Sequence, residues 1–213
     1  TRWEDCQKAV KGQEIIFHLA AQTGSIDFHQ KNPGKIFYDN LVMNVQLMEA
    51  ARQAGVKKFI GVGSVTEYPE NSPLPFSEKN IWQGFPEETN APYSFAKKMM
   101  LIQAKAYLKQ YGFKAVNPLF SNVYGFGMNI KSGYVISTLI KRIDEAEQNN
   151  KEYIEIWGTG KATRDFIYLK DAVEGLLLIA EKYESPEPVN IASGKETSIK
   201  ALAEIIARLM RFK

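Results

Sequence analysis

Short apolar runs and amphipathic stretches follow one another along the chain. Continuous apolar runs of strand length occur at residues 14–21 (EIIFHLAA) and 57–64 (KKFIGVGS). Such runs lack the polar alternation of a half-exposed strand, so they predict strands that are buried on both faces. A third run, residues 113–125 (FKAVNPLFSNVYG), predicts another strand that enters a loop.

The stretches between these runs have the three- and four-residue apolar spacing of amphipathic helices. In residues 93–110, for example, Met100, Ala104 and Leu108 form one stripe. Gly55 ends one such stretch and Ser198 precedes another, as is typical of helix termini. Helices are therefore predicted at residues 1–12, 40–55, 93–110, 134–148, 169–183 and 198–210, with further strands at 152–157 and 187–193.

This order of strands and helix-length crossovers predicts an α/β fold with a doubly wound, Rossmann-like parallel sheet. Such a fold begins with a strand, a Gly-rich turn and a helix. The spacings GVGSVT and GTGKAT imitate that turn, but the first leads into a loop with Pro69 and the second into RDF. We therefore expect the N-terminal Gly-rich unit to be missing by truncation. Residues 1–130 are expected to form a partial dinucleotide-binding domain, and residues 131–213 to contribute to a smaller C-terminal substrate domain and to the last Rossmann elements.

Composition excludes several classes of protein. The chain has 45% hydrophobic and 24% charged residues, as ordinary globular proteins do. Its net charge of +3 comes from 27 basic and 24 acidic residues that are intermixed, so no nucleic acid partner is expected. The apolar runs are too short to span a membrane, and the single cysteine, Cys6, fits a reducing compartment. These features predict a cytoplasmic protein without a membrane partner.

Candidate chemistry lies at one strand end and on one predicted helix. Ser64 ends a predicted buried strand, where open parallel sheets hold ligands, and Tyr93 and Lys97 lie four residues apart on one helical face. A phenol with a pKa near 10 is a poor base at neutral pH unless a nearby cation favours the phenolate. The lysine would supply that cation, and the serine hydroxyl would orient a substrate oxygen. On spacing alone, such a pair is more often structural than catalytic.

The order of five short motifs changes this interpretation. FHLAA, GVGS, PYSFAK, NVYG and RDFIYLKDA follow one another along nearly the whole chain, which resembles the extended short-chain dehydrogenase/reductase family. The resemblance implies a Rossmann domain with a smaller substrate domain, NAD or NADP as the cofactor, and a nucleotide-diphosphate sugar as the substrate. It also implies a homodimer with the helix at 93–110 in the contact.

The resemblance also implies residue roles. Ser64, Tyr93 and Lys97 fall on the family's catalytic triad. Ala20 and Ala21 fall on the strand end that lines the dinucleotide, and Lys97 and Ser64 would contact the same cofactor.

Further positions match the parts of the family that hold the substrate. Asn122 matches an asparagine that faces both cofactor and substrate, and Arg164 matches an arginine that clamps the nucleotide diphosphate. The loop before Tyr93 and the WGTG segment resemble the GDP-L-fucose synthase branch, which favours a GDP-sugar. By that resemblance Arg142 and Trp157 also contact the substrate nucleotide.

The chain departs from the expected pattern at Phe120, where the family's PxN segment has proline, and at the two positions that serve epimerisation in this branch. The branch epimerises with a cysteine two residues after the serine and a histidine before the next helix, where this chain has Thr66 and Tyr134. The residues for reduction are therefore present, whereas those for epimerisation are replaced. Two alternatives stay open: a UDP-hexose 4-epimerase with bound NAD, and a non-catalytic relative that binds nucleotide sugars. A dehydratase is disfavoured because the acid, Glu67, comes one residue too late.

The remaining candidates point to no additional site. His18 lies in an apolar strand and is predicted to be a packed core residue. His29 lies in a polar segment, predicted to be a loop, without ligand partners at metal-binding spacing, so no metal is expected. The choice between NAD and NADP depends on residues after the second strand of the fold, and the sequence leaves it open.

Overall fold

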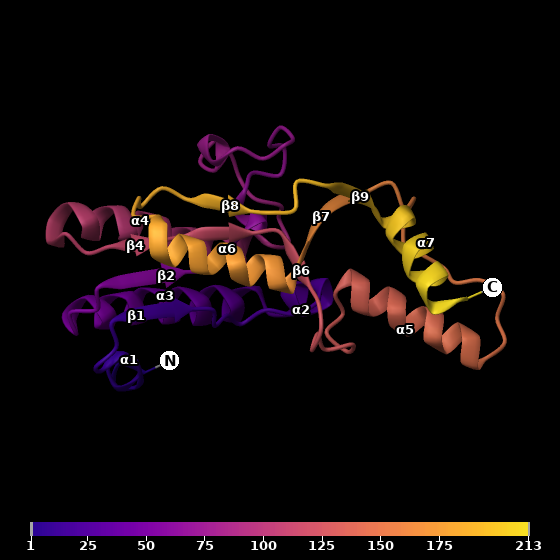
Figure 1. Cartoon of the computed structure of the whole chain (residues 1–213), viewed down its shortest axis with the longest axis horizontal. Helices are drawn as coiled ribbons and strands as arrows, with labels where there is room; N and C mark the ends of the chain where they lie inside the picture. Colours follow the sequence, from indigo (N-terminus) through magenta and orange to yellow (C-terminus); the bar gives the residue numbers. More distant parts are fainter. Residues whose placement is uncertain (1, 213) are drawn as a thin grey trace. The chain divides into compact units, whose positions relative to one another are not determined.

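The structure is a computed structural model that describes residues 2–212, so Thr1 of the predicted first helix lies outside the described residues. The chain divides into two compact units (Figure 1). Unit 1 comprises Thr1–Phe120 and Val173–Ile191, and unit 2 comprises Ser121–Ala172 and Ala192–Lys213. The predicted functional division at residue 130 stays a prediction. No helix within residues 2–212 is both long and apolar enough to cross a membrane.

Unit 1 contains the predicted parallel sheet. In one part β2 (Lys58–Gly61) lies between β1 (Ile15–His18) and β4 (Ala115–Val116), and in the other β5 (Pro118–Phe120) lies between β3 (Gly63–Ser64) and β8 (Val189–Ile191). All four pairings are parallel. Single residues, Val62 and Asn117, separate β2 from β3 and β4 from β5, and the Asn117 side chain donates to the Gly61 carbonyl oxygen at 3.0 Å. The α/β prediction is confirmed.

Helices cover both faces of this sheet, as two neighbouring residues of β2 demonstrate. Phe59 is fully buried in the core formed with α1 (Trp3–Val10), α3 (Pro33–Gln53) and α4 (Ala91–Tyr111). Lys58 points to the other face, because consecutive side chains of a strand alternate. Its ammonium donates to the carbonyl oxygens of Ile179 and Ala180, at 3.0 and 2.6 Å, at the end of α6 (Leu169–Lys182).

Local signals explain the helix ends in unit 1. Pro33 starts α3 seven residues earlier than predicted, because proline suits the first helical turn, where its missing N–H is not needed. The predicted helix at 93–110 is confirmed as α4, and Gly112 ends it with a left-handed φ of 67°. The remaining helical segments of unit 1 are α2 (Ile26–Lys31), η1 (Val65–Glu67) and η2 (Glu78–Asn80).

Unit 2 combines a mixed sheet with two amphipathic helices. Strand β7 (Thr163–Tyr168) pairs in parallel with β6 (Asn122–Tyr124) and antiparallel with β9 (Glu196–Ser198). The predicted helices are α5 (Val135–Gln148) and α7 (Ile199–Met210), and Ser198 caps α7 as predicted by accepting from the Ala201 N–H at 3.1 Å. The buried residues of this core come from both helices: Leu139, Ile143, Leu202, Ala203 and Ile206.

Two strand predictions were wrong. Residues 152–157 do not form a strand, although their apolar positions alternate; Ile154 and Ile156 pack against the helical core of unit 2 instead. The strand lies further along the chain, at β7. Burial of β1 on both faces was also wrong, because Ile15 and Phe17 are 45% and 39% exposed. An apolar run predicts a strand, but only its neighbours decide which faces they cover.

Candidate active site

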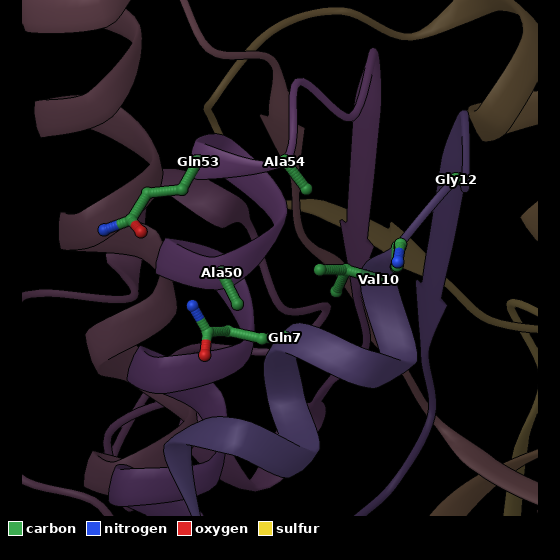
Figure 2. A pocket seen from close by; sticks show the side chains of 7 residues that line it. Gln7, Val10, Gly12, Ala50, Gln53 and Ala54 are labelled. Atoms are coloured by element: carbon green, nitrogen blue, oxygen red, sulfur yellow. The ribbon is translucent and has the colours of Figure 1, made fainter.

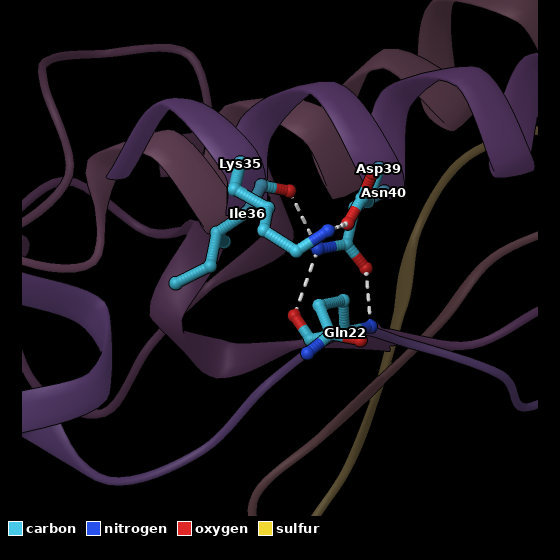
Figure 3. Close-up of polar contacts among 5 residues, drawn as sticks. All are labelled: Gln22, Lys35, Ile36, Asp39 and Asn40. Atoms are coloured by element: carbon cyan, nitrogen blue, oxygen red, sulfur yellow. Dashed lines mark hydrogen bonds and ion pairs between the residues drawn. The ribbon is translucent and has the colours of Figure 1, made fainter. Parts of the chain in front are cut away.

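The loop after β1 carries Ala20 and Ala21, and a buried asparagine of α3 holds it in place (Figure 3). Asn40 is fully buried; its Oδ1 accepts from the Gln22 N–H at 2.9 Å and its Nδ2 donates to the Gln22 carbonyl oxygen at 2.8 Å. The same Nδ2 donates to the Ile36 carbonyl oxygen at 2.7 Å. Ala20 is exposed and Ala21 is half-buried, so two small side chains follow the carboxyl end of β1. No pattern in the sequence points to Asn40.

Replacing Asn40 with leucine is expected to lower the free energy of unfolding by about 2 to 4 kcal/mol, because several backbone groups lose their partners. Urea unfolding of the complete protein measures this change. Lys35 in the same helix provides the control: its ammonium lies 2.6 Å from an Asp39 carboxylate oxygen at the surface (Figure 3), and Lys35→Ala should cost about 0.5 kcal/mol or less. Equal losses in the two variants would contradict a special role for Asn40.

Lys97 lies at the carboxyl ends of two neighbouring strands. Its ammonium donates to the carbonyl oxygens of Val62 and Ala20, at 3.0 and 3.4 Å. The residue is only 2% exposed, and burial lowers the pKa of Lys97 to about 8, while the negative charge of Glu67 acts in the opposite direction. A buried ammonium is thus held where a doubly wound sheet receives its ligand.

Ser64 begins a tight turn that α4 fixes in place. The turn is η1, and Ser64 is its N-cap. Its Oγ accepts from the backbone N–H of Thr66 at 3.2 Å and from the Thr66 hydroxyl at 3.1 Å. Ser94 of α4, which is fully buried, donates from its hydroxyl to the Thr66 carbonyl oxygen at 2.8 Å. The serine position is therefore tied to the helix that carries Tyr93 and Lys97.

The side chain of Glu67 bonds to the first residue of the same turn. It is 1% exposed, and its Oε1 accepts from the Ser64 N–H at 2.8 Å. Gly63 makes room for it, because a Cβ at that position would lie 2.5 Å from Oε1. Burial raises the pKa of Glu67 to about 7, although the Ser64 hydrogen bond and the charges of Lys97 and Lys98 act to lower it. The spacing of Glu67 in the sequence argued against a dehydratase but did not predict that its side chain holds the Ser64 N–H.

The raised pKa of Glu67 predicts a specific pH dependence of stability. Between pH 4.5 and 7 the unfolded chain ionises Glu67 while the folded protein keeps it protonated, so stability falls as the pH rises. The full loss is roughly 3 kcal/mol, since each pKa unit is worth about 1.4 kcal/mol. Glu67→Gln keeps an acceptor for the Ser64 N–H and removes the titration. Melting temperatures measured from pH 4.5 to 7 should therefore show the stability of the variant rising relative to that of the wild type. A constant difference across this pH range would contradict the raised pKa of Glu67.

Tyr93 packs against a histidine that the sequence analysis assigned to a loop. That assignment was wrong: His29 lies in α2 and is 4% exposed. Its ring meets the Tyr93 ring edge to face, with centroids 5.7 Å apart, and its Nε2 lies 3.2 Å from the Thr23 hydroxyl. Burial lowers the pKa of His29, which favours the neutral ring, while the charge of Glu87 acts in the opposite direction. The Tyr93 ring is thereby positioned from a helix distant in sequence.

His18 is a packed core residue, as predicted. Its ring lies 5.8 Å from that of Phe59, and its Nε2 lies 2.7 Å from Asn44 Oδ1. Because an amide oxygen only accepts, Nε2 carries the proton. Burial lowers the pKa of His18 to about 4. Asn44 Nδ2 in turn donates to the Ala96 carbonyl oxygen at 3.1 Å, which links β1 and α3 to the residue before Lys97.

In unit 2 the structure brings two of the predicted substrate residues together. The Arg142 guanidinium of α5 lies 4.7 Å from the centre of the Trp157 ring and donates to the Glu155 carbonyl oxygen at 2.7 Å. Trp157 is 82% exposed, so one face of a large aromatic ring is supported by a cation and available to a planar group. Nothing in the local sequence spacing predicts that these two side chains meet.

The other two predicted residues of unit 2 lie on neighbouring strands. Asn122 of β6 donates from Nδ2 to the Asp165 carbonyl oxygen at 2.9 Å, and Arg164 of β7 is exposed and bonds only to the Thr163 carbonyl oxygen among the described residues. Asp165 accepts from the N–H and hydroxyl of Ser193, both at 2.9 Å. The aspartate of RDF is therefore structural here, whereas the arginine faces solvent. Tyr134 is the N-cap of α5 and is 46% exposed.

Surface depressions of the described chain also lie elsewhere. One is lined by residues at the end of α1, at the end of α3 and before β1 (Figure 2), namely Gln7, Val10, Lys11, Gly12, Ala50, Gln53 and Ala54. Because β1 starts after this depression, it lies at the amino edge of the parallel sheet. Doubly wound sheets bind ligands at the carboxyl edge, so we assign no ligand to it.

Comparisons with known proteins show what the whole chain resembles. A family model described as the NAD dependent epimerase/dehydratase family matches residues 1–192. A GDP-L-fucose synthase of Sinorhizobium fredii is 33% identical over 219 residues, which cover 100% of this chain and 69% of that protein. The chain spans about two thirds of the length of its first relatives.

Solved structures share the fold. A GDP-L-fucose synthetase from Naegleria fowleri bound to NADP superposes with a TM-score of 0.88 at 26% identity, covering 100% of this chain and 66% of that one. A UDP-glucose 4-epimerase from Thermotoga maritima with UDP-glucose gives a TM-score of 0.86, also at 26% identity. The match covers 99% of this chain and 66% of that one.

Proposed function

Because the chain belongs to the NAD dependent epimerase/dehydratase family, we propose that the complete protein is an NAD(P)-dependent reductase and epimerase of nucleotide sugars. A GDP-linked keto sugar is the favoured substrate, since relatives at about 30% identity and more are GDP-L-fucose synthases. A single observation carries the catalytic part of this proposal: the buried Lys97 ammonium, bonded to two strand ends and one helical turn from Tyr93.

The residues after β1 and β2 fit a dinucleotide. Ala20 and Ala21 are small, so a flat ring could approach the backbone of the strand end, and Lys97 holds a charge beside them. We propose that Lys97 binds the ribose next to the nicotinamide and that Ser64 lies near the ring. When bound, the reduced cofactor supplies a hydride to the keto carbon.

The three triad residues divide the remaining work. Ser64 would donate a hydrogen bond to the keto oxygen of the substrate, and Tyr93 would give its phenolic proton to that oxygen as reduction proceeds. The Lys97 ammonium would stabilise the phenolate that Tyr93 leaves behind. Proton transfer of this kind contributes about 10²- to 10⁴-fold in rate.

Unit 2 would bind the nucleotide of the substrate. The exposed Trp157 ring backed by Arg142 suits a base, and Arg164 offers a bidentate fork for the diphosphate. Asn122 would face both the substrate and the cofactor. In this proposal residues 1–130 are mainly the dinucleotide-binding part, and residues 131–213 contribute to the substrate part and to the last Rossmann elements.

Assembly and location complete the proposal. We propose a homodimer with α4 in the contact, based on the resemblance of the motifs. A single free cysteine, Cys6, suits the reducing cytoplasm. Sedimentation of the complete protein would test the dimer.

A direct assay tests the function. The complete protein is mixed with NADPH or NADH and GDP-4-keto-6-deoxymannose, and cofactor oxidation is followed by absorbance. Oxidation that requires the keto sugar supports the reductase. Interconversion of UDP-glucose and UDP-galactose without added cofactor would instead favour a 4-epimerase, which the Thermotoga maritima structure keeps open. Binding without turnover in either assay would identify a non-catalytic relative.

A further inference from the structure

Thr66 stands where the resembled branch has a catalytic cysteine, and its contacts give it a different task. Its hydroxyl donates to Ser64 Oγ at 3.1 Å, and its backbone N–H donates to the same oxygen at 3.2 Å. A serine hydroxyl has two acceptor lone pairs and one proton to donate. Because Thr66 donates to both lone pairs, the Ser64 hydroxyl can interact with a ligand only by donating its proton.

We propose that Thr66 is a positioning residue that commits the Ser64 hydroxyl to donating, so that Ser64 offers a donor to a carbonyl oxygen and no free acceptor to the proton of an alcohol. A ketone oxygen can only accept, and it therefore matches a committed donor. This inference rests on the proposed function, and it specifies the keto form as the substrate recognised by Ser64.

The surroundings hold Thr66 in the required geometry. The buried Ser94 hydroxyl donates to the Thr66 carbonyl oxygen at 2.8 Å, and Glu67 accepts from the Ser64 N–H at 2.8 Å. The turn is thus bonded to α4 at one end and to a buried carboxyl group at the other.

Two variants of the complete protein test the proposal. Thr66→Val removes the hydroxyl and keeps the backbone N–H, and we expect kcat for keto-sugar reduction to fall about 5- to 10-fold, since one hydrogen bond is worth about 1 kcal/mol. KM should change little, and inhibition by the alcohol product should become stronger, because one Ser64 lone pair is freed. Thr66→Ser should restore kcat. Melting temperatures verify that each variant is folded.

A double-mutant cycle separates this role from a purely structural one. In a Ser64→Ala background there is no hydroxyl to orient, so adding Thr66→Val should cost nothing further. An equal loss of kcat in both backgrounds, or failure of Thr66→Ser to restore it, would overturn the proposal. If the wild-type protein reduces no keto sugar, the proposed function falls and the inference with it. Reduction that Thr66→Val leaves unchanged would remove the inference alone.

Discussion

Turnover of the keto sugar is expected to fall by about 10²- to 10⁴-fold when Tyr93 is replaced with phenylalanine. The substitution keeps the ring that packs edge to face on His29 at 5.7 Å and removes only the phenolic hydroxyl. Binding of the sugar nucleotide, measured by calorimetry, should therefore remain within a few-fold of the wild type. The steady-state rate of NADPH oxidation by the complete protein measures the loss.

A second tyrosine on the same helix provides the control. Tyr111 is the last residue of α4, and the Arg52 guanidinium lies 4.1 Å from its ring centre, a contact that phenylalanine retains. Tyr111→Phe should leave turnover unchanged. If Tyr93→Phe turned over the keto sugar at the wild-type rate, Tyr93 would not be the proton donor.

The second large loss of turnover is expected when Lys97 is replaced, and its neighbour Lys98 provides a matched control. Both lysines are buried in α4, at 2% and 1% exposure, and both bond to backbone carbonyl oxygens. Lys97→Met removes the cation one turn from Tyr93, so turnover should fall about 100-fold or more. Stability should change little, because relief of the buried charge offsets the lost hydrogen bonds.

Lys98→Met should have the opposite profile. The Lys98 ammonium donates to the Ile81 carbonyl oxygen at 2.7 Å and lies 5.1 Å from the centre of the Trp82 ring. Here the lost ring contact adds to the lost hydrogen bond and outweighs the relief of the buried charge, so the free energy of unfolding should fall by about 2 to 3 kcal/mol, while turnover per folded molecule stays within a few-fold. Rates and urea unfolding of both variants provide the measurement. Equal loss of turnover in the two variants would mean that Lys97 acts only as part of the scaffold.

Local patterns predicted the elements that carry the candidate site. Continuous apolar runs marked β1 and β2 with β3, four-residue spacing marked α4, and Ser198 marked the start of α7. The order of short motifs along the chain predicted the family, which the match over residues 1–192 confirms. These signals are short-range in sequence, so no knowledge of distant neighbours was needed to read them.

Other features could not be predicted because they depend on distant partners. The alternating residues 152–157 have no strand beside them, and Ile154 and Ile156 pack on helices instead. His29 has the polar neighbours of a loop, yet it is buried against Tyr93. A glutamate such as Glu67 is almost never fully buried without partners, so composition alone favours the surface.

The sequence by itself determined the α/β class, the position of Ser64 at a strand end and the one-turn spacing of Tyr93 and Lys97. Only the tertiary structure decided the hydrogen-bonding and electrostatic state of these groups. Burial lowers the pKa of Lys97 to about 8. Asn40 holds the loop that contains Ala20 by bonding to Gln22, 18 residues away in sequence. The physical reason is that helix and strand periodicity arise from neighbouring residues, whereas desolvation and hydrogen-bond partners arise from whatever the fold packs against them.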